Sequence, residues 1–397
     1  MTAATPNSSP TAHHAFARSD RSAIGVWWWT VDRWMLGVIA LLIAIGVVIA
    51  FAASPAAAAR MNIGDPFHFA VRQCVFAAIA ATILIGVSML DVKTVRRSAF
   101  FIWLIAIAIM VALPFLGHNA KGATRWIELG GFSLQPSEFM KPVLIVLVAW
   151  MFSEGQKGDG VPGVSIAFVL YLIPVALLLM QPDVGQTVLI TCTFGAVFWM
   201  AGVPLSWVMG LGAVAVTGLG STYFLLPHVA SRVDKFLQPD KADTHQVDAA
   251  RVAQAAGGLF GRGPGEGVLK RAIPDAHTDF ALSVGAEEFG LIFLAVVITL
   301  FAIVVVRGLY RAMKLSDPFE QVAAAGLFVL VGLQATINIA VNLDLIPTKG
   351  MTLPFISYGG SSMLAMGLTL GMALALTRRR PGAYAANEGL AKAGSFA

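Results

Sequence analysis

The sequence predicts an all-α integral membrane protein, a bundle of about ten transmembrane helices. Of its 397 residues, 57% are hydrophobic and only 12% are charged, and its mean hydropathy is +0.77. Soluble proteins carry about 25% charged residues. The apolar residues fall into runs of about 20, the length of helix that crosses a hydrocarbon core of about 30 Å. The alternating polarity of outer-membrane strands is missing, so we expect the spans to be helices.

Ten apolar runs are the predicted spans. They cover residues 34–53, 68–90, 99–116, 136–152, 164–180, 184–201, 205–226, 280–306, 322–341 and 354–377. Short loops rich in Lys and Arg mark the cytoplasmic side of a membrane. Three basic segments fall on the side of the N-terminus: Lys93, Arg96 and Arg97; Arg307, Arg311 and Lys314; Arg378, Arg379 and Arg380. We therefore predict that both termini are cytoplasmic and that one large loop, about residues 227–279, faces outward.

The chain accordingly divides into a polytopic membrane domain, residues 34–380, and two cytoplasmic tails, residues 1–33 and 381–397. The pI of about 9.3 reflects this topology rather than a basic surface patch, so we expect no nucleic-acid binding. The sequence contains no HExxH, paired CxxC, GxSxG or Walker motif, which argues against structural zinc and serine hydrolysis. In the large loop, "VDAARVAQAAGGLFG" is expected to form a short helix on the membrane surface, with its apolar residues towards lipid.

Ionisable residues that enter the apolar region are the candidates for chemistry, because each needs a partner or water there. In "AKGATRWIELGGFSLQPSEFMK", an outward loop carries Lys121 and Arg125, and Glu138 and Lys141 follow inside the fourth span. Glu138 and Lys141 are three residues apart and share a helix face, so they can pair. The pair either belongs to a site or only neutralises itself and ties the helix to a neighbour.

Two further stretches place charge beside interrupted apolar runs. In "MQPDVGQTVLI", Asp183 either faces a cavity or caps the helix that follows. In "PTKGMTLPFISYGGSSM", Lys349 precedes a span whose apolar run is broken by Gly359 and Gly360. Such a break can line a cavity and offer backbone N–H groups to a phosphate. A glycine kink for helix packing is the alternative.

The stretch "PDAHTDFALSVGAEEFG" gathers four acids and a histidine at the start of the eighth span. Asp279 falls in the first helical turn, and Glu287 and Glu288 lie about two turns deeper. Asp279 and Glu287 are then about 12 Å apart along the helix, too far for the paired carboxylates of a glycosidase. We expect Glu287 or Glu288 to bond a neighbouring helix. His277 either positions Asp279 or faces water.

Four long motifs, in this order and spacing, resemble the SEDS family of shape, elongation, division and sporulation proteins. They are "RWIELGGFSLQPSEFMK", "QPDVGQT", "GGLFGRGPGEGVLKRAIPDAHTDFALSVGAEEFG" and "LIPTKGMTLPFISYGGSSM". The resemblance covers about residues 34–380. The last motif is more similar to the division member of the family than to the elongation member.

The resemblance implies a peptidoglycan glycosyltransferase that polymerises lipid II on the periplasmic side and releases undecaprenyl diphosphate. Carried over by motif, Asp279 is the catalytic residue, and Trp126 matches the tryptophan of the family's RWI element. Polar positions of the family's cavity are matched by Glu138, Lys141, Asp183 and Lys349.

Glycosyl transfer needs a base for the acceptor hydroxyl and stabilisation of the diphosphate leaving group. Asp279 is placed for the first task, with His277 beside it. For the second, the choice among Lys121, Arg125, Lys141, Lys349 and a metal stays open. The resemblance also implies, less firmly, a divalent cation, Mg²⁺ or Mn²⁺.

The implied partners are lipid II, the nascent glycan strand, a class B penicillin-binding transpeptidase of the FtsI type and other divisome proteins. The implied location is the bacterial inner membrane at the division septum. Three alternatives stay open: a lipid II flippase, a non-catalytic divisome scaffold, and a polymerase of cell elongation. A flippase would need polar residues that lead through to the inner leaflet, whereas the polar sites above lie mostly towards the outer side.

Overall fold

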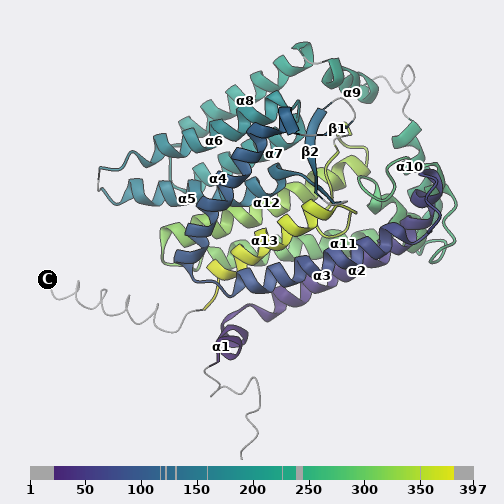
Figure 1. The fold of residues 1–397 in the computed structure, drawn as a ribbon, viewed down its shortest axis with the longest axis horizontal. Helices are drawn as coiled ribbons and strands as arrows, with labels where there is room; N and C mark the ends of the chain where they lie inside the picture. Colours follow the sequence, from purple (N-terminus) through teal and green to yellow (C-terminus); the bar gives the residue numbers. More distant parts are fainter. Residues whose placement is uncertain are drawn as a thin grey trace, which may run out of the picture.

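The computed structural model describes residues 22–116, 118–120, 123–129, 132–158, 160–225, 227–237, 245–348 and 350–379, which form a helix bundle with one small sheet (Figure 1). Ten apolar helices match the ten predicted spans in order. They are α2 (Arg33–Arg60), α3 (His68–Ser88), α4 (Val92–Leu116), α5 (Pro136–Gln156), α6 (Gly163–Met180), α7 (Val184–Met200), α8 (Leu205–Leu225), α11 (Ala281–Ala312), α12 (Pro318–Asn342) and α13 (Gly360–Leu376). Of the described helices, eight are long and apolar enough to cross a membrane, while α7 and α13 are shorter. The predicted fold class is confirmed.

The clearest difference from the predicted boundaries is at α13, which begins at Gly360 rather than at residue 354. The chain before it is not helical, because Phe355 takes a φ of 62° in the left-handed region. In the opposite direction, α11 is longer than its predicted span and continues six residues beyond it, to Ala312. A hydropathy run ends where polar residues begin, whereas a helix can continue past the hydrocarbon core into the interface.

The remaining elements are short. They are α1 (Ala23–Thr30), α9 (Pro227–Leu237), α10 (His245–Gly257), the 3₁₀ helix η2 (Leu269–Ala272), and the strands β1 (His118–Ala120), β2 (Ala123–Leu129) and β3 (Phe132–Leu134). The strands form an antiparallel sheet in the order β1-β2-β3. Our sequence analysis missed this sheet, although two β-rich runs separated by Gly130 and Gly131 are typical of a hairpin.

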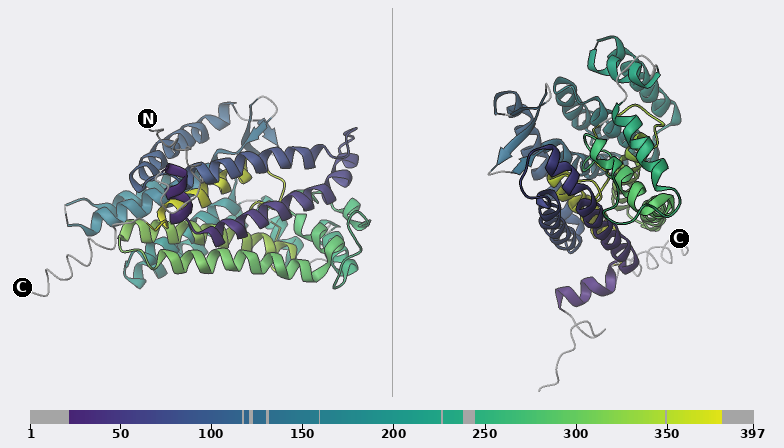
Figure 2. Two further views of the ribbon diagram at one scale, coloured as in Figure 1. Left: turned by 90° about the horizontal axis from the view of Figure 1, so that it is seen from below. Right: turned by 90° about the vertical axis from the view of Figure 1, so that its right-hand side faces the viewer.

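The helices run lengthwise beside one another, so the bundle has two distinct ends (Figure 2). At one end Asp32 forms ion pairs with Arg307 and Arg311, each at 2.8 Å, and Arg378 donates to the carbonyls of Ser88 and Met89. We call this the basic end. The opposite end, which carries Asp279, the strands, α9 and α10, is the loop end. The basic segments therefore share one end with the start of α2, as predicted.

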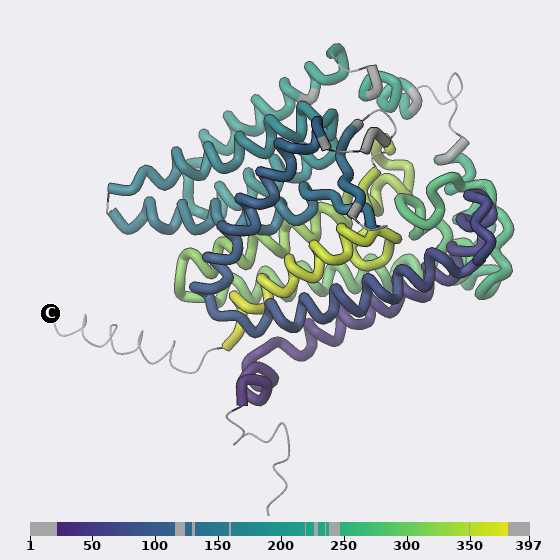
Figure 3. The backbone as a smooth tube through the Cα atoms, in the orientation of Figure 1, coloured from purple at the N-terminus to yellow at the C-terminus, as the bar shows by residue number. Residues whose placement is uncertain are grey.

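The centre of the bundle is α5, most of whose residues are buried, whereas α8 lies at its edge with its hydrophobic stretch exposed. Close helix packing relies on small residues, because they let two backbones approach. A Cβ added at Gly367 of α13 would lie 2.5 Å from the carbonyl oxygen of Ala80 in α3. These two helices run alongside each other (Figure 3).

Candidate active site

Asp279 lies at the loop end, in the turn just before α11 rather than in its first helical turn as predicted, because Phe280 is the N-cap residue. Its backbone carbonyl accepts hydrogen bonds from the side-chain amides of Asn338, at 3.1 Å, and Asn342, at 2.9 Å. A Cβ added at Gly350 would lie 3.5 Å from Asp279 Oδ2. The carboxylate therefore faces the backbone of the loop between α12 and α13.

A buried polar cluster crosses the bundle next to this turn. Lys141 Nζ lies 2.8 Å from Glu138 Oε2, which confirms the predicted pairing. Lys141 also donates to Gln334 Oε1 at 3.0 Å, and Gln186 donates to Glu138 Oε1 at 2.6 Å. Gln334 in turn donates to the carbonyl of Thr352, at 3.2 Å. The cluster therefore joins α5, α7 and α12 to the loop that faces Asp279.

Asp183 has the capping role, one of the two that its sequence position left open, and it also faces Arg125. Its side chain caps α7 by accepting from the backbone N–H of Gln186 at 3.3 Å, and Oδ2 lies 3.6 Å from Arg125 Nη1. Burial raises the pKa of this carboxyl, against the opposing effects of the Arg125 charge and the Gln186 N–H. Arg125 also donates to the carbonyls of Gln181, at 2.9 Å, and Pro182. Arg125 thus ties β2 to the turn before α7.

The neighbour of Arg125 on β2 is Trp126, which pairs in register with His118 of β1. Successive residues of a strand point to opposite faces. In β2, however, the register with β1 shifts between His118 and Asn119, so this alternation is interrupted at Arg125 and does not place Arg125 and Trp126 on opposite faces. The predicted substrate-binding residues Lys121 and Lys349 lie outside the described residues.

His277 is buried, so the alternative in which it faces water is wrong, while its positioning of Asp279 stays a prediction. Its ring centroid lies 4.7 Å from that of Phe69 and 5.6 Å from that of Tyr358. Its carbonyl accepts from the N–H of Tyr358 at 2.8 Å. The aromatic cluster fixes the turn two residues before Asp279. Arg72 of α3, which our sequence analysis did not consider, lies over the ring of Phe132 in β3, at 5.8 Å.

Glu287 and Glu288 bond a neighbouring helical element, as expected, but it is the short η2 of the outer loop rather than another transmembrane helix. Glu287 accepts from the backbone N–H groups of Leu269 and Lys270, each at 2.8 Å. Glu288 accepts from Lys270 Nζ and from the N–H of Gly265, the latter at 3.1 Å. Both carboxylates are fully buried. They hold the outer loop, because its unpaired N–H groups and the ammonium of Lys270 supply the donors that a buried carboxylate requires.

The same loop fills a break in α11. Gly290 has non-helical angles, φ 86° and ψ 178°. Around it, Leu291 and Ile292 donate to the carbonyls of Gly258 and Leu259, while Arg262 and Gly263 donate to those of Glu287 and Glu288, at 2.9–3.2 Å. Residues 258–263 thus replace the helical hydrogen bonds that the break removes. We call these six residues the strap. The strap and the two glutamates fix the first turns of α11, and with them the turn that carries Asp279.

The helix predicted within the large loop exists as α10, but two of its alanines face protein rather than lipid. Ala250 and Ala253 are buried in a cluster with Phe280 and Val284 of the α11 start. Gln254 of α10 donates to the hydroxyl of Ser283 at 2.8 Å. Alanines allow α10 to pack closely on protein, so its buried face is an internal contact of the loop end.

The described residues contain no group of three or more His, Cys, Asp or Glu side chains that could hold a metal ion. The donors here do not form a protein cage for Mg²⁺ or Mn²⁺. A divalent cation stays a prediction.

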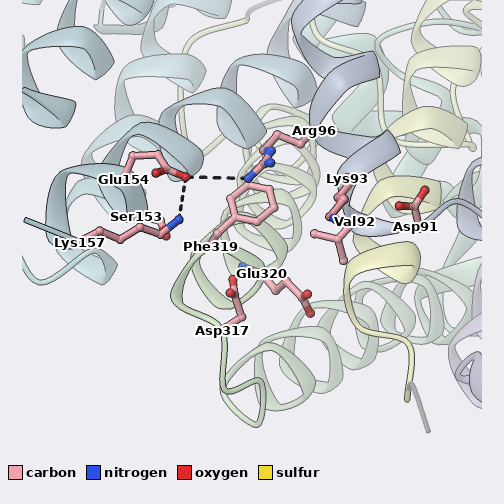
Figure 4. Close-up of a pocket in the computed structure, with 10 residues that line it drawn as sticks. All are labelled: Asp91, Val92, Lys93, Arg96, Ser153, Glu154, Lys157, Asp317, Phe319 and Glu320. Carbon is pink, nitrogen blue, oxygen red and sulfur yellow. Dashed lines mark hydrogen bonds and ion pairs between the residues drawn. The ribbon is translucent and has the colours of Figure 1, made fainter. Parts of the chain in front are cut away.

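A pocket of about 480 Å³ lies at the basic end, away from Asp279 (Figure 4). It is lined by Asp91, Val92, Lys93, Arg96, Ser153, Glu154, Lys157, Asp317, Phe319 and Glu320. Glu154 pairs with Lys157 at 2.9 Å and with Arg96 at 3.9 Å. The predicted site residues lie at the other end of the bundle, so this pocket is separate from the candidate active site.

Comparison with known proteins decides the family. The sequence model of the FtsW, RodA and SpoVE family, described as a cell cycle protein, matches residues 32–381. The chain belongs to this family. It is 72% identical to a protein of Caulobacter vibrioides named "Probable peptidoglycan glycosyltransferase FtsW", over 95% of this chain and 96% of that one. A protein of the same name in Trichlorobacter lovleyi is 37% identical, over 86% and 92% of the two chains. The resemblance inferred from the four motifs is confirmed.

Solved structures of the FtsW, RodA and SpoVE family share the fold. A chain of the structure described as "Structural coordination of polymerization and crosslinking by a peptidoglycan synthase complex" has a TM-score of 0.73 and 26% identity, and the match covers 88% of this chain and 98% of that one. The rod shape determining protein RodA of Thermus thermophilus has a TM-score of 0.66 and 24% identity, over 89% and 99%. The protein is therefore a multi-pass membrane protein of this family.

The polar residues that our sequence analysis missed share a pattern. Gln334, Asn338 and Asn342 follow one another at intervals of four on α12, within "QATINIAVN". Residues four apart lie on one helix face, and amides inside an apolar span need partners. This spacing alone indicates a polar stripe that faces the bundle interior.

Proposed function

We propose that this protein is a peptidoglycan glycosyltransferase that polymerises lipid II during cell division, with Asp279 as its base. The observation that carries the proposal is the fixed position of Asp279, whose backbone is held by two amides while its carboxylate faces the loop that precedes α13. The name of the Caulobacter vibrioides relative, 72% identical over nearly the whole chain, supports the activity and the division role.

In the proposed reaction Asp279 takes the proton of the acceptor sugar hydroxyl. The hydroxyl oxygen attacks the anomeric carbon of the donor, and the bond from that carbon to the diphosphate breaks. Undecaprenyl diphosphate leaves with the bonding electron pair. A positioned base contributes about 10²- to 10⁴-fold to the rate of such a step.

The leaving diphosphate needs positive charge, but two of the described cations of the site already face a carboxylate. Glu138 neutralises Lys141, and Asp183 faces Arg125. We propose that these four residues shape the site and orient the substrate, and that Trp126 and His277 contribute to the same walls. We propose Lys121 and Lys349 as further sources of positive charge for the diphosphate. Lys349 directly precedes Gly350, the residue next to the Asp279 carboxylate. A divalent cation is a further proposed source of charge.

We further propose that the loop end faces the periplasm and that the protein acts with a class B transpeptidase of the FtsI type, and other divisome proteins, at the septum of the inner membrane. The gathering of Arg and Lys at the basic end supports the orientation. The similar chain in a peptidoglycan synthase complex, whose description joins polymerization to crosslinking, supports the partner. The FtsW names of the relatives support the division role over elongation.

A lipid II flippase is disfavoured by the inner part of α5. Residues 143–149, deeper than Lys141, are all apolar and buried in the bundle centre. A headgroup that crossed the bundle beside α5 would need polar contacts along that stretch. The polar cluster thus suits a site that opens at one end.

The test uses the purified full chain, alone and with its cognate transpeptidase, incubated with lipid II. We expect glycan polymer from the wild type and at least a 10²-fold lower rate from Asp279→Asn. The matched control is Asp248→Asn, the same chemical change on exposed α10, which should polymerise normally. Wild-type polymerisation by Asp279→Asn would remove Asp279 as the base. Headgroup translocation by the protein alone in vesicles, without polymer, would favour a flippase, and normal division of Asp279→Asn cells would favour a scaffold.

A further inference from the structure

We infer that Asn338 and Asn342 are positioning residues that set the direction of the Asp279 carboxylate, an inference that rests on the proposed role of Asp279 as the base. Both amides lie on α12 and are almost fully buried. Neither side chain touches a group that would react. Each bonds the main chain of a loop that borders the site.

Hydrogen bonds at both the nitrogen and the oxygen of the Asn342 side-chain amide fix its orientation. Its Nδ2 donates to the carbonyl of Asp279 at 2.9 Å and to that of Asn338 at 3.0 Å. Its Oδ1 accepts from the hydroxyl of Ser283 at 2.8 Å. Because an oxygen is required on the Ser283 side and donors on the other, a flipped amide would lose these bonds.

The amide of Asn338 joins the two loops that meet at the site. Its Nδ2 donates to the carbonyl of Met351 at 2.6 Å and to that of Asp279 at 3.1 Å. Met351 follows Gly350, whose Cα faces Asp279 Oδ2. One amide thus sets the distance between the backbone that carries the acid and the backbone that the acid faces.

The Asp279 carbonyl needs these donors for a local reason. The first N–H groups of α11 bond to the carbonyl of Phe280, so the carbonyl of Asp279 lies outside the helical ladder. A buried carbonyl without a donor is unfavourable, and the turn would rotate to find one. That rotation would turn the Asp279 side chain with it, and a displacement of about 1 Å can lower a rate about 10²-fold.

Burial of this face of α12 does not by itself explain why Asn338 and Asn342 are asparagines. Leucine has the same branched arrangement of side-chain heavy atoms as asparagine but is apolar, and an apolar side chain would satisfy a buried helix face better. The two asparagines are therefore explained by the carbonyls that they bond.

The test compares Asn338→Leu, Asn342→Leu and the isosteric Asn342→Asp with Thr193→Val, in the full chain with its cognate transpeptidase and lipid II. Thr193 is a buried polar residue of α7 whose hydroxyl bonds its own helix at Leu189, so it controls for loss of a buried polar group. For the asparagine variants we expect kcat to fall about 10- to 100-fold with KM within about twofold. Thermal unfolding midpoints should stay close to that of Thr193→Val.

The outcomes separate this inference from the proposed function. Wild-type kcat in a folded Asn342→Asp or Asn342→Leu protein, while Asp279→Asn is inactive, would overturn the positioning role alone. A rise in KM with unchanged kcat would also overturn it, because the amides would then act in binding. If Asp279→Asn itself polymerises normally, Asp279 is not the base, and the proposed function is overturned rather than the positioning role alone. Should the leucine variants not fold, Asn342→Asp, which keeps the volume, still decides.

Discussion

The two ends of the bundle use charge differently. At the basic end, Asp32 pairs with Arg307 and Arg311, and Arg378 bonds carbonyls at the α3 terminus, so charged side chains join helix ends to one another. At the loop end, amides and buried glutamates bond backbone groups, and the main chain around Asp279 is fixed instead. The difference indicates that the basic end maintains the bundle, whereas the loop end maintains the geometry of one turn.

The largest effect on stability should come from the buried pair at the loop end. Glu138→Gln or Lys141→Met leaves the other partner as an uncompensated buried charge, and we expect a loss of about 3–5 kcal/mol in the free energy of unfolding. Unfolding in detergent, followed by circular dichroism, measures it. The double variant Glu138→Leu with Lys141→Met should regain most of the loss. If each single variant is as stable as the wild type, the pair is not desolvated and the contrast between the two ends weakens.

Gly261 of the strap has a matched control in Gly265, which follows the strap in the same loop. Gly261 has a φ of 82° and a Cβ there would lie 2.1 Å from the Glu288 carbonyl, whereas Gly265 has a φ of 83° and open space around it. We expect Gly261→Ala to lose about 3 kcal/mol, and Gly265→Ala about 1 kcal/mol from the left-handed backbone alone. Thermal unfolding of both proteins checks the difference. Equal losses would mean that the strap does not pack into the break of α11.

At the basic end, Asp32→Asn should lose about 2 kcal/mol, the usual value of hydrogen bonds to a charged group. Burial alone would raise the pKa of Asp32, but hydrogen bonds from Arg307 and the Met35 N–H, with the Arg311 charge, hold it below its ordinary value. This stabilisation is present above the unfolded pKa of about 3.9 and is lost as pH falls through the lower folded pKa. The wild type and Asp32→Asn should therefore differ at pH 7 and converge once the pH falls below the lowered folded pKa of Asp32. A constant difference across that range would contradict the charged role of Asp32.

The smallest effect is expected in the pocket of the basic end. Glu154 is partly exposed, and its pairs with Lys157 and Arg96 are open to solvent. Glu154→Gln should change the free energy of unfolding by about 0.5 kcal/mol or less. The change should disappear in about 1 M salt, where charges are screened within about 3 Å. A larger or salt-independent loss would place this pocket among the buried networks of the loop end.

Much of the fold follows from local sequence features. Each of the ten apolar runs became a helix, because about 20 apolar residues need a helix to satisfy their backbone in lipid. The Glu138–Lys141 pair followed from helix spacing alone, and the position of Asp183 before an apolar run indicated its cap. The choice of Asp279 as the acid came from the resemblance to a family, since many acids occupy a helix start without catalytic function.

The sequence by itself therefore determined the membrane bundle, its spans, the common end of its basic segments and the pairs that lie within one helix. Tertiary structure decided which distant groups surround the buried polar residues. The outer loop and η2 supply donors to Glu287 and Glu288, aromatic rings pack around His277, carbonyls accept from Arg125, and the amides of α12 bond the Asp279 carbonyl. The physical reason is the sequence distance over which each interaction acts. Hydropathy and helix spacing act over a few neighbouring residues, whereas a buried donor or acceptor takes whichever partner the folded chain brings to it.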